Sequence, residues 1–167
     1  MIETEYDVIV AGYGPVGETC ANLLGYYGIK ALVLDKEKNA YPLPRAITWD
    51  AECQRAMSHC EFLSEVKTRK IRGVDNKDAN KKSIMKITME GFDTYNYQHR
   101  ILFIHQPQFD EAHRENAKKY STNTIKTGCE LLAVDEINGV VNCTYKDIET
   151  NEQFKVTSKY LLACDGA

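Results

Sequence analysis

The stretch Tyr6–Gly17, with the sequence YDVIVAGYGPVG, decides the fold of this chain of 167 residues. Its apolar, β-branched first half predicts a buried strand over Tyr6–Ala11. The residues that follow recur at helical spacing: Val16, Cys20, Leu23, Leu24 and Tyr27. Gly28 suits the position just after a helix, and Ala31–Asp35 (ALVLD) predicts a second buried strand. Strand, helix and strand in this order predict a right-handed βαβ unit with parallel strands.

Three glycines between the first strand and the helix form the pattern G-x-G-x-x-G. Gly12 permits the tight turn, Gly14 lets the backbone approach a pyrophosphate, and Gly17 lets helix and strand pack closely. Asp35 ends the second strand 18 residues after Gly17, close to the ~20 residues that separate the glycines from the acidic residue in dinucleotide-binding units. Its carboxylate would accept hydrogen bonds from the adenosine ribose and repel a 2′-phosphate, which argues against NADP. A glycine-rich turn with a surface Asp is the alternative, and the pattern alone does not separate FAD from NAD.

The middle of the chain predicts loops, helices and short strands. Tyr41–Arg45 contains two prolines and predicts an extended loop. A helix is expected next, with one face formed by Trp49, Cys53, Met57 and Cys60. Residues 71–100 predict short strands, and 101–105 predict another strand before a helix that opens at Pro107. Tyr95, Tyr97 and His99 alternate at strand spacing. They could line a substrate-facing sheet or belong to an ordinary amphipathic strand.

The last third predicts an antiparallel meander over 124–159, packed against the parallel sheet. Its strands are expected at 124–137, 140–148 and 153–159, with the hairpin signal Asn138-Gly139 between the first two. Tyr160–Cys164 (YLLAC) predicts a separate closing strand before Asp165. The expected fold class is therefore α/β, a Rossmann-like parallel sheet with an antiparallel three-stranded meander.

Composition excludes several classes of protein. The net charge of −3 and the lack of a basic stretch argue against nucleic-acid binding. No apolar run approaches the ~18 residues that span a bilayer, and the acidic opening does not resemble a secretory signal. Six cysteines without a Cys-x-x-Cys pair favour small packing residues over the alternatives of disulfides or a zinc site. His59, His99, His105 and His113 lack catalytic or metal-ligand spacing and are expected to be surface or satisfied residues. We therefore expect a cytoplasmic protein.

Beyond these patterns, the chain resembles the N-terminal part of FAD-dependent aromatic hydroxylases (class A flavoprotein monooxygenases) of the phenol and hydroxyphenylpropionate hydroxylase type. The opening 6–17, including Pro15, is similar to theirs, as is Val33-Leu34-Asp35-Lys36. Pro44-Arg45-Ala46 matches a motif whose arginine contacts the flavin nucleotide in that family. Gln106-Pro107 matches a step whose glutamine lies near the ribityl chain, and 160–167 matches the start of an Asp-Gly motif. Cys164 and His113 depart from the family pattern, which usually has Gly or Ala and leucine there.

The resemblance implies FAD as cofactor, NAD(P)H as co-substrate and a small aromatic substrate that receives one oxygen atom from O2. The implied cofactor-binding residues are Gly12, Gly14, Pro15, Val16, Gly17, Asp35, Lys36, Arg45, Gln106 and Asp165. It implies that 1–167 is an incomplete FAD-binding domain, with strands in 71–100 contributed to the substrate side. Because relatives continue for hundreds of residues, this chain alone is expected to be inactive. No catalytic residue or oligomeric state follows from the sequence. The competing interpretations are an NAD-dependent dehydrogenase and a truncated nucleotide-binding remnant.

Overall fold

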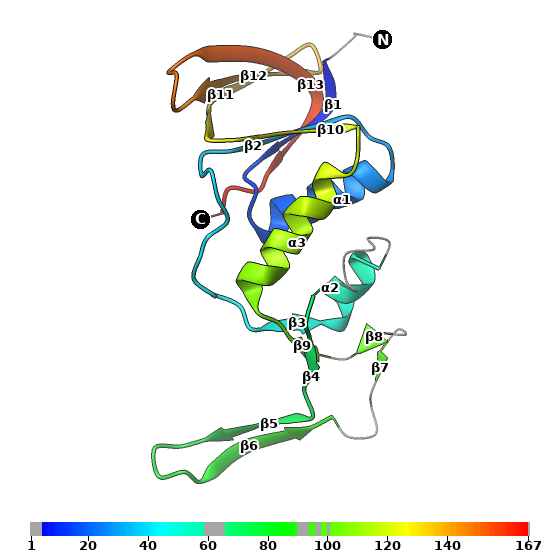
Figure 1. Cartoon of the computed structure of the whole chain (residues 1–167), viewed down its shortest axis with the longest axis vertical. Coiled ribbons are helices and arrows are strands. Elements are labelled where there is room, and N and C mark those ends of the chain that lie inside the picture. Colours follow the sequence, from blue (N-terminus) through cyan, green and yellow to red (C-terminus); the bar gives the residue numbers. More distant parts are fainter. Residues whose placement is uncertain (1–4, 59–65, 90–93, 96–97, 100, 167) are drawn as a thin grey trace.

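The centre of the structure is a six-stranded mixed sheet (Figure 1). The computed structural model describes residues 5–58, 66–89, 94–95, 98–99 and 101–166. The strands of this sheet are β1 (Tyr6–Ala11), β2 (Ala31–Asp35), β10 (Asn123–Thr127), β11 (Cys129–Ile137), β12 (Val140–Asp147) and β13 (Gln153–Ala163). Their order is β10-β2-β1-β13-β12-β11, and the first four strands run parallel. β13, β12 and β11 pair antiparallel, so β13 belongs to both parts.

Alternating side chains of β1 and β2 face two different layers. Val8, Val10 and Val33 are buried against α1 (Pro15–Tyr26) and α3 (Gln106–Lys118), with which they form one apolar cluster. Ile9, Leu32 and Leu34 face the other way and pack against the meander. The predicted packing of the meander on the parallel sheet is therefore confirmed. It is achieved by a sheet that curls over its own face, as Figure 1 shows.

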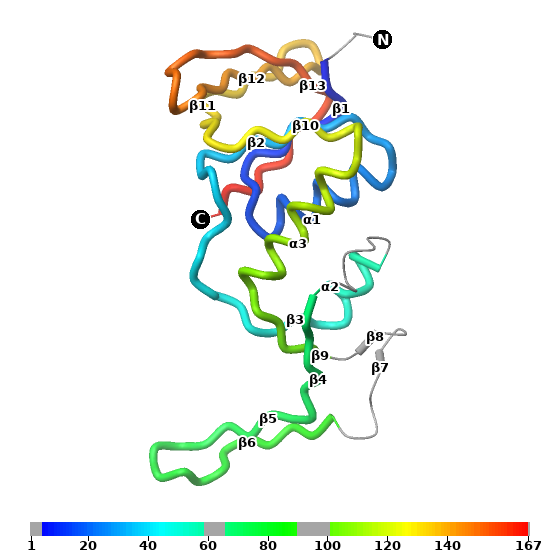
Figure 2. The backbone as a smooth tube through the Cα atoms, viewed as in Figure 1, coloured from blue at the N-terminus to red at the C-terminus, as the bar shows by residue number. Residues whose placement is uncertain are grey.

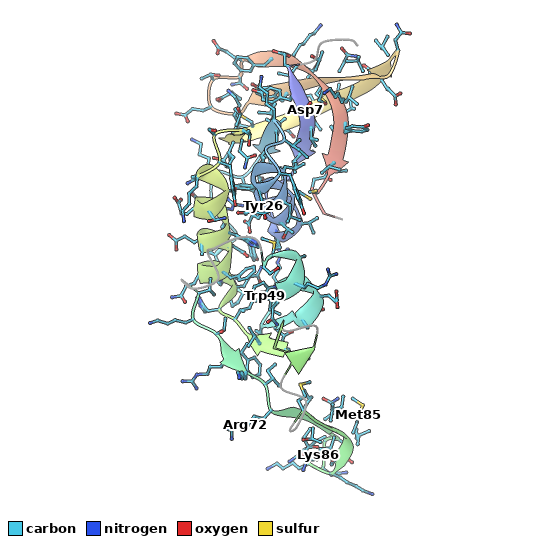
Figure 3. The ribbon with its side chains drawn as sticks, turned by 90° about the vertical axis from the view of Figure 1, so that its right-hand side faces the viewer. Asp7, Tyr26, Trp49, Arg72, Met85 and Lys86 are labelled. Atoms are coloured by element: carbon cyan, nitrogen blue, oxygen red, sulfur yellow. The ribbon has the colours of Figure 1, made fainter. Side chains whose placement is uncertain are left out.

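A second, smaller region lies at the far end of α3. Strands β3 (Thr48–Asp50), β9 (Ile101–Phe103) and β4 (Arg69–Lys70) form a three-stranded sheet beside α2 (Ala51–Ala56). Trp49 packs edge-to-face on Phe109 of α3 at 4.9 Å between ring centroids. In Figure 3, Trp49 lies at the level of α2, between the main sheet and the outlying strands. α3 therefore connects both regions, because its first turn packs here and Ala117 packs under the main sheet.

Two hairpins complete the described part of the chain. β5 (Gly73–Lys77) pairs with β6 (Ser83–Thr88), and β7 (Thr94–Tyr95) pairs with β8 (Gln98–His99). Figure 2 shows the β5–β6 hairpin extending away from the rest of the chain. These short antiparallel strands confirm the expectation for residues 71–100. The side chains of Tyr95 and His99, and all of Tyr97, lie outside the described residues.

Three predicted boundaries were wrong. The helix begins after Asp50, because the Asp50 carboxylate accepts a hydrogen bond from the Cys53 N–H (2.8 Å) and caps it. Trp49 therefore lies in a strand and not on the helical face. The expected strand 124–137 is broken at Gly128, whose φ of 72° ends β10 and starts β11. The expected closing strand Tyr160–Cys164 is not separate, because β13 runs unbroken through Ala163.

Candidate functional site

A cavity of about 740 Å³ lies at the carboxyl ends of β1, β2 and β13. In open α/β sheets ligands bind at this edge, because the strands there are followed by loops and helix N-termini. Nine of the ten residues predicted to hold the cofactor line the cavity, and Gly17 is the one that does not. The sheet topology therefore brings together segments that are up to about 150 residues apart in sequence.

Gly12 and Gly17 are required by the protein's own backbone. Gly12 has φ of 98°, and a Cβ there would lie 2.4 Å from the carbonyl oxygen of Cys164. A Cβ on Gly17 would lie 2.0 Å from the carbonyl oxygen of Gly12. Any side chain at either position would push the first strand, the helix and β13 apart. Gly17 thus acts beneath the loop rather than on the cavity wall, in the packing role that the sequence predicts.

Gly14 is different, because the protein does not require it. Gly14 caps α1 in an extended conformation (φ −83°, ψ −172°), and no atom lies within 4 Å of a Cβ built on it. It borders the cavity together with Pro15 and Val16, and the Val16 side chain is 63% exposed. The N-terminus of α1 therefore presents its free N–H groups and partial positive charge to open space.

Asp35 is held in place by the loop that it faces. Its Oδ2 accepts a hydrogen bond from the Tyr13 N–H (2.9 Å), and its Oδ1 accepts one from the Glu37 N–H (2.9 Å). The next residue, Lys36, also lines the cavity and is exposed. Asp35 thus sits at the cavity wall as expected. The structure adds that its carboxylate is already oriented by two peptide groups.

Gln106 ties the proline-rich loop to α3. Its Oε1 accepts hydrogen bonds from the backbone N–H groups of Arg45 (2.6 Å) and Ala46 (2.7 Å). Its Nε2 donates to Asp110 Oδ2 at 3.3 Å. The guanidinium of Arg45 stacks on the ring of Tyr41, 4.1 Å from its centroid, and both residues line the cavity. The sequence pairs Arg45 with Gln106 through family motifs, whereas the structure joins them directly.

Asp165 reaches the cavity because β13 ends beside β1. The Cys164 N–H donates to the carbonyl oxygen of Ala11 (2.7 Å), which continues the ladder to the last residue before Asp165. Burial and the neighbouring thiol of Cys20 raise the pKa of Cys164 to about 11, so Cys164 is a neutral thiol at pH 7. Cys164 therefore fits as a small packing residue beneath the loop.

Sequence reasoning missed three ionisable residues that line the cavity: Glu18, Asp110 and Arg114. Arg114 donates from Nε to Glu18 Oε1 at 2.7 Å and lies 3.6 Å from Asp35 Oδ2. Glu18 and Asp110 are 1% and 3% exposed. One signal could have found two of them. Gln106, Asp110 and Arg114 are spaced by four residues and form a polar stripe on α3 that points toward the loop.

Burial shifts the pKa of several of these groups. Desolvation raises the pKa of Glu18 to about 8, against the opposing effect of Arg114, and it also raises the pKa of Asp110. Desolvation raises the pKa of Tyr13 too, whose ring lies under the Arg114 guanidinium. It lowers the pKa of His113 to about 4, so this buried imidazole is neutral at pH 7.

Within the described ranges, the other histidines and cysteines form no second site. His105 is exposed and occupies the N-cap position of α3 without a capping hydrogen bond from its side chain, while His59 and the side chain of His99 lie outside the described residues. Among the described residues, no group of three His, Cys, Asp or Glu side chains could hold a metal ion. In the same part of the chain, no helix is long and apolar enough to cross a membrane.

Comparison with known proteins identifies the family of this chain. Residues 5–167 match the family described as "FAD binding domain", and the chain belongs to that family. It is 28% identical over 166 residues to a 3-(3-hydroxy-phenyl)propionate/3-hydroxycinnamic acid hydroxylase of Comamonas testosteroni, covering 98% of this chain and 28% of the relative. It is 31% identical over 164 residues to the protein of the same name from Escherichia coli O8 (strain IAI1), covering 95% and 28%. The chain therefore spans under a third of the curated relatives it matches.

Solved structures share the fold. The p-nitrophenol 4-monooxygenase PnpA from Pseudomonas putida DLL-E4 matches with a TM-score of 0.84 at 22% identity, over 99% of this chain and 42% of that one. The flavin-dependent monooxygenase PieE, solved in complex with FAD and substrate, matches with a TM-score of 0.77 at 16% identity, over 97% and 30%. The α/β fold class is confirmed, and a flavoprotein domain is favoured over an NAD-dependent dehydrogenase.

The residues present fit FAD as the cofactor of this family. The tight Gly12–Gly17 packing brings the α1 N-terminus to the cavity, and the space at Gly14 is open for a diphosphate. The cavity volume lies within the range of cofactor pockets. Arg45 and Asp165 line the same cavity from two other segments, so the cavity extends beyond the glycine-rich loop.

Proposed function

We propose that this chain is the FAD-binding part of a flavin-dependent monooxygenase that hydroxylates small aromatic compounds with NAD(P)H and O2. The observation that carries this proposal is the convergence of the Gly12–Gly17 loop, Asp35, Arg45 and Asp165 on one cavity. Because the relatives named as aromatic hydroxylases are more than three times as long, their activity and substrates are part of the proposal. We also propose that the protein is located in the cytoplasm, since the described cysteines are free thiols.

Each end of the cavity suits a different part of the cofactor. The N–H groups at the start of α1, above Gly14, would bind the diphosphate, and the oriented carboxylate of Asp35 would bind the adenosine ribose. Arg45, fixed through its own N–H by Gln106, would contact the nucleotide from another segment of the cavity lining. When bound, FAD supplies the redox chemistry, and the protein supplies binding, orientation and exclusion of water.

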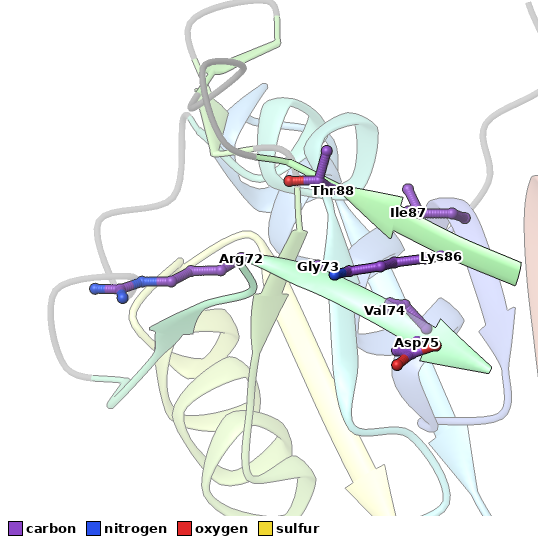
Figure 4. A pocket seen from close by; sticks show the side chains of 7 residues that line it. All are labelled: Arg72, Gly73, Val74, Asp75, Lys86, Ile87 and Thr88. Carbon is purple, nitrogen blue, oxygen red and sulfur yellow. The ribbon is translucent and has the colours of Figure 1, made fainter. Parts of the chain in front are cut away.

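The β5–β6 hairpin is proposed to belong to the substrate side of the complete protein. Its apolar side chains are exposed in this chain: Val74, Ile84, Met85 and Ile87. An open hollow on one face is lined by both strands, as Figure 4 shows, with Lys86 across it and Arg72 extending away. Two strands with an uncovered apolar face are marginal by themselves, which supports a further sheet partner in the complete protein.

Titration by flavin fluorescence tests the cofactor. The chain is expected to bind FAD more tightly than FMN, because FMN lacks the adenosine that the βαβ unit recognises. Competition by NADP is expected to be weak, because its 2′-phosphate would approach the carboxylate of Asp35. The Asp35→Ala variant should lose most of the preference for FAD over FMN. Equal affinity of the unmodified chain for FMN and FAD would contradict the proposed site.

A further inference from the structure

Arg114 holds the peptide that forms the rim of the cavity. One terminal nitrogen of its guanidinium donates to the carbonyl oxygen of Tyr13, and the guanidinium stacks on the Tyr13 ring at 4.7 Å. The preceding peptide group, between Gly12 and Tyr13, is held by Asp35, whose Oδ2 accepts from the Tyr13 N–H. The Tyr13 carbonyl that Arg114 holds belongs to the peptide group that joins Tyr13 to Gly14. Arg114, a residue of α3, therefore controls the position of a loop that belongs to the βαβ unit.

Three acidic groups share this one guanidinium. Glu18 accepts from Arg114 Nε at 2.7 Å, Asp35 lies 3.6 Å from a terminal nitrogen, and Asp110 interacts with the same charge. His113 approaches Glu18 Oε2 to 3.7 Å, but its imidazole is neutral at pH 7 because burial lowers its pKa. If all three acids were ionised, the cluster would carry two uncompensated negative charges behind a site for an anion.

Glu18 and Asp110 each have one buried carboxylate oxygen without a hydrogen-bond partner among the described residues, Oε2 and Oδ1 respectively. Of the two, Glu18 is the one whose carboxylate contacts Arg114 directly, its side chain is 1% exposed, and burial raises its pKa to about 8. Asp35, by contrast, accepts hydrogen bonds from two peptide N–H groups, one on each carboxylate oxygen. Glu18 also lies in the first turn of α1 and borders the cavity, where a diphosphate would add further negative charge.

We propose that Arg114 and Glu18 form a proton-linked positioning pair for the dinucleotide: Arg114 fixes the Tyr13 peptide and Asp35, and Glu18 is protonated when the diphosphate binds. The inference rests on the proposed function, because it concerns the same cavity. Its sign follows from linkage. A bound diphosphate favours neutral Glu18, so binding takes up a proton, and affinity falls as pH rises through the pKa of Glu18 near 8.

The test is the dissociation constant of FAD between pH 6.5 and 9, repeated with ADP-ribose, which carries the diphosphate without a flavin ring. We expect both constants to rise by about fivefold to tenfold over this range, within the limit of tenfold per pH unit for one proton. The isosteric variant Glu18→Gln should bind as tightly as the unmodified chain at pH 6.5 and show no rise. The control Glu130→Gln changes a half-buried residue of the same cavity that lies outside the Arg114 cluster, and it should retain the full rise.

Arg114 variants supply a second readout. Arg114→Met should weaken FAD binding at every pH and move the remaining step to higher pH, because Arg114 holds the pKa of Glu18 down. Arg114→Lys keeps the positive charge without the planar guanidinium, so its FAD affinity should lie between those of the unmodified chain and Arg114→Met. If Arg114→Met does not fold, as judged by circular dichroism, Glu18→Gln decides alone. FAD affinity that is independent of pH, or an unchanged rise in Glu18→Gln, would overturn the inference while leaving the proposed function intact. Failure of both probes to bind at any pH would overturn the proposed function, and the inference with it.

Discussion

Replacing Gly14 with valine should separate cofactor binding from folding. The backbone at Gly14 is extended and allowed for any residue, and its Cβ would meet no protein atom within 4 Å. The folded chain therefore contains no steric reason for glycine at this position. A diphosphate on the α1 N-terminus would supply one, because the valine side chain would occupy the space where the phosphate oxygens approach the N–H groups.

The expected magnitudes differ between the two properties. FAD affinity should fall at least tenfold, which corresponds to about 1.4 kcal/mol of binding free energy. The free energy of unfolding should change by about 1 kcal/mol or less, the usual difference between glycine and an apolar residue at a helix N-cap. Gly12→Ala and Gly17→Ala should behave in the opposite way. Their Cβ atoms would lie 2.4 and 2.0 Å from backbone oxygens, so the fold itself should be disrupted.

The assay combines urea unfolding of the cofactor-free chain with flavin fluorescence titration of FAD. Gly28→Ala serves as the control, because Gly28 has φ of 70° and does not border the cavity. It should lower stability by about 1 kcal/mol and leave the dissociation constant of FAD unchanged. A Gly14→Val protein that folds and binds FAD with unchanged affinity would refute the reasoning and place the cofactor elsewhere.

Three further variants test other parts of the structure. Burial lowers the pKa of His113 to about 4, whereas a histidine in the unfolded chain has a pKa of about 6.5. Because the unfolded chain then binds more protons, the unmodified chain should lose up to about 3 kcal/mol of stability between pH 6.5 and 4, relative to His113→Leu. Urea unfolding at each pH measures this loss. Gln106→Leu leaves the N–H groups of Arg45 and Ala46 without their acceptor, so it should lower stability by about 2 kcal/mol and FAD affinity severalfold. The control Gln108→Leu, at an exposed position of the same helix, should change neither quantity in the same titrations. Ile9→Ala removes a fully buried side chain between the sheet and the meander and should cost about 3 kcal/mol by chemical denaturation; a loss below 1 kcal/mol would contradict the observed packing.

Local patterns were predictable where one residue type has one physical use. The apolar runs of β1 and β2 match the sequence expectation at both ends, because strands buried on both faces tolerate few polar residues. The predicted roles of Gly12 and Gly17 were correct, since the steric contacts at these two positions depend only on the βαβ geometry and β13. The role assigned to Gly14 stays a prediction that the Gly14→Val experiment tests.

Boundaries failed where a single polar or flexible residue outweighed the hydrophobic pattern. Asp50 ended the strand and capped the helix, although Trp49 has the spacing of a helical residue. Gly128 divided one apolar run into a parallel and an antiparallel strand. In both cases the periodicity of side chains was correct for part of the segment, and a local backbone preference decided where the element changed.

The βαβ unit, the glycine-rich loop and the hairpin at Asn138-Gly139 could be predicted from the sequence, because each depends on contacts between near neighbours in the chain. The contacts of Gln106 with Arg45, and of Arg114 with Glu18 and Asp35, join residues about 60 to 100 positions apart and could be seen only in the folded chain. Burial explains the difference. Whether Glu18 is charged, and whether Arg114 serves the loop or the solvent, depends on the packing of α3 against α1, which no local pattern of either helix specifies.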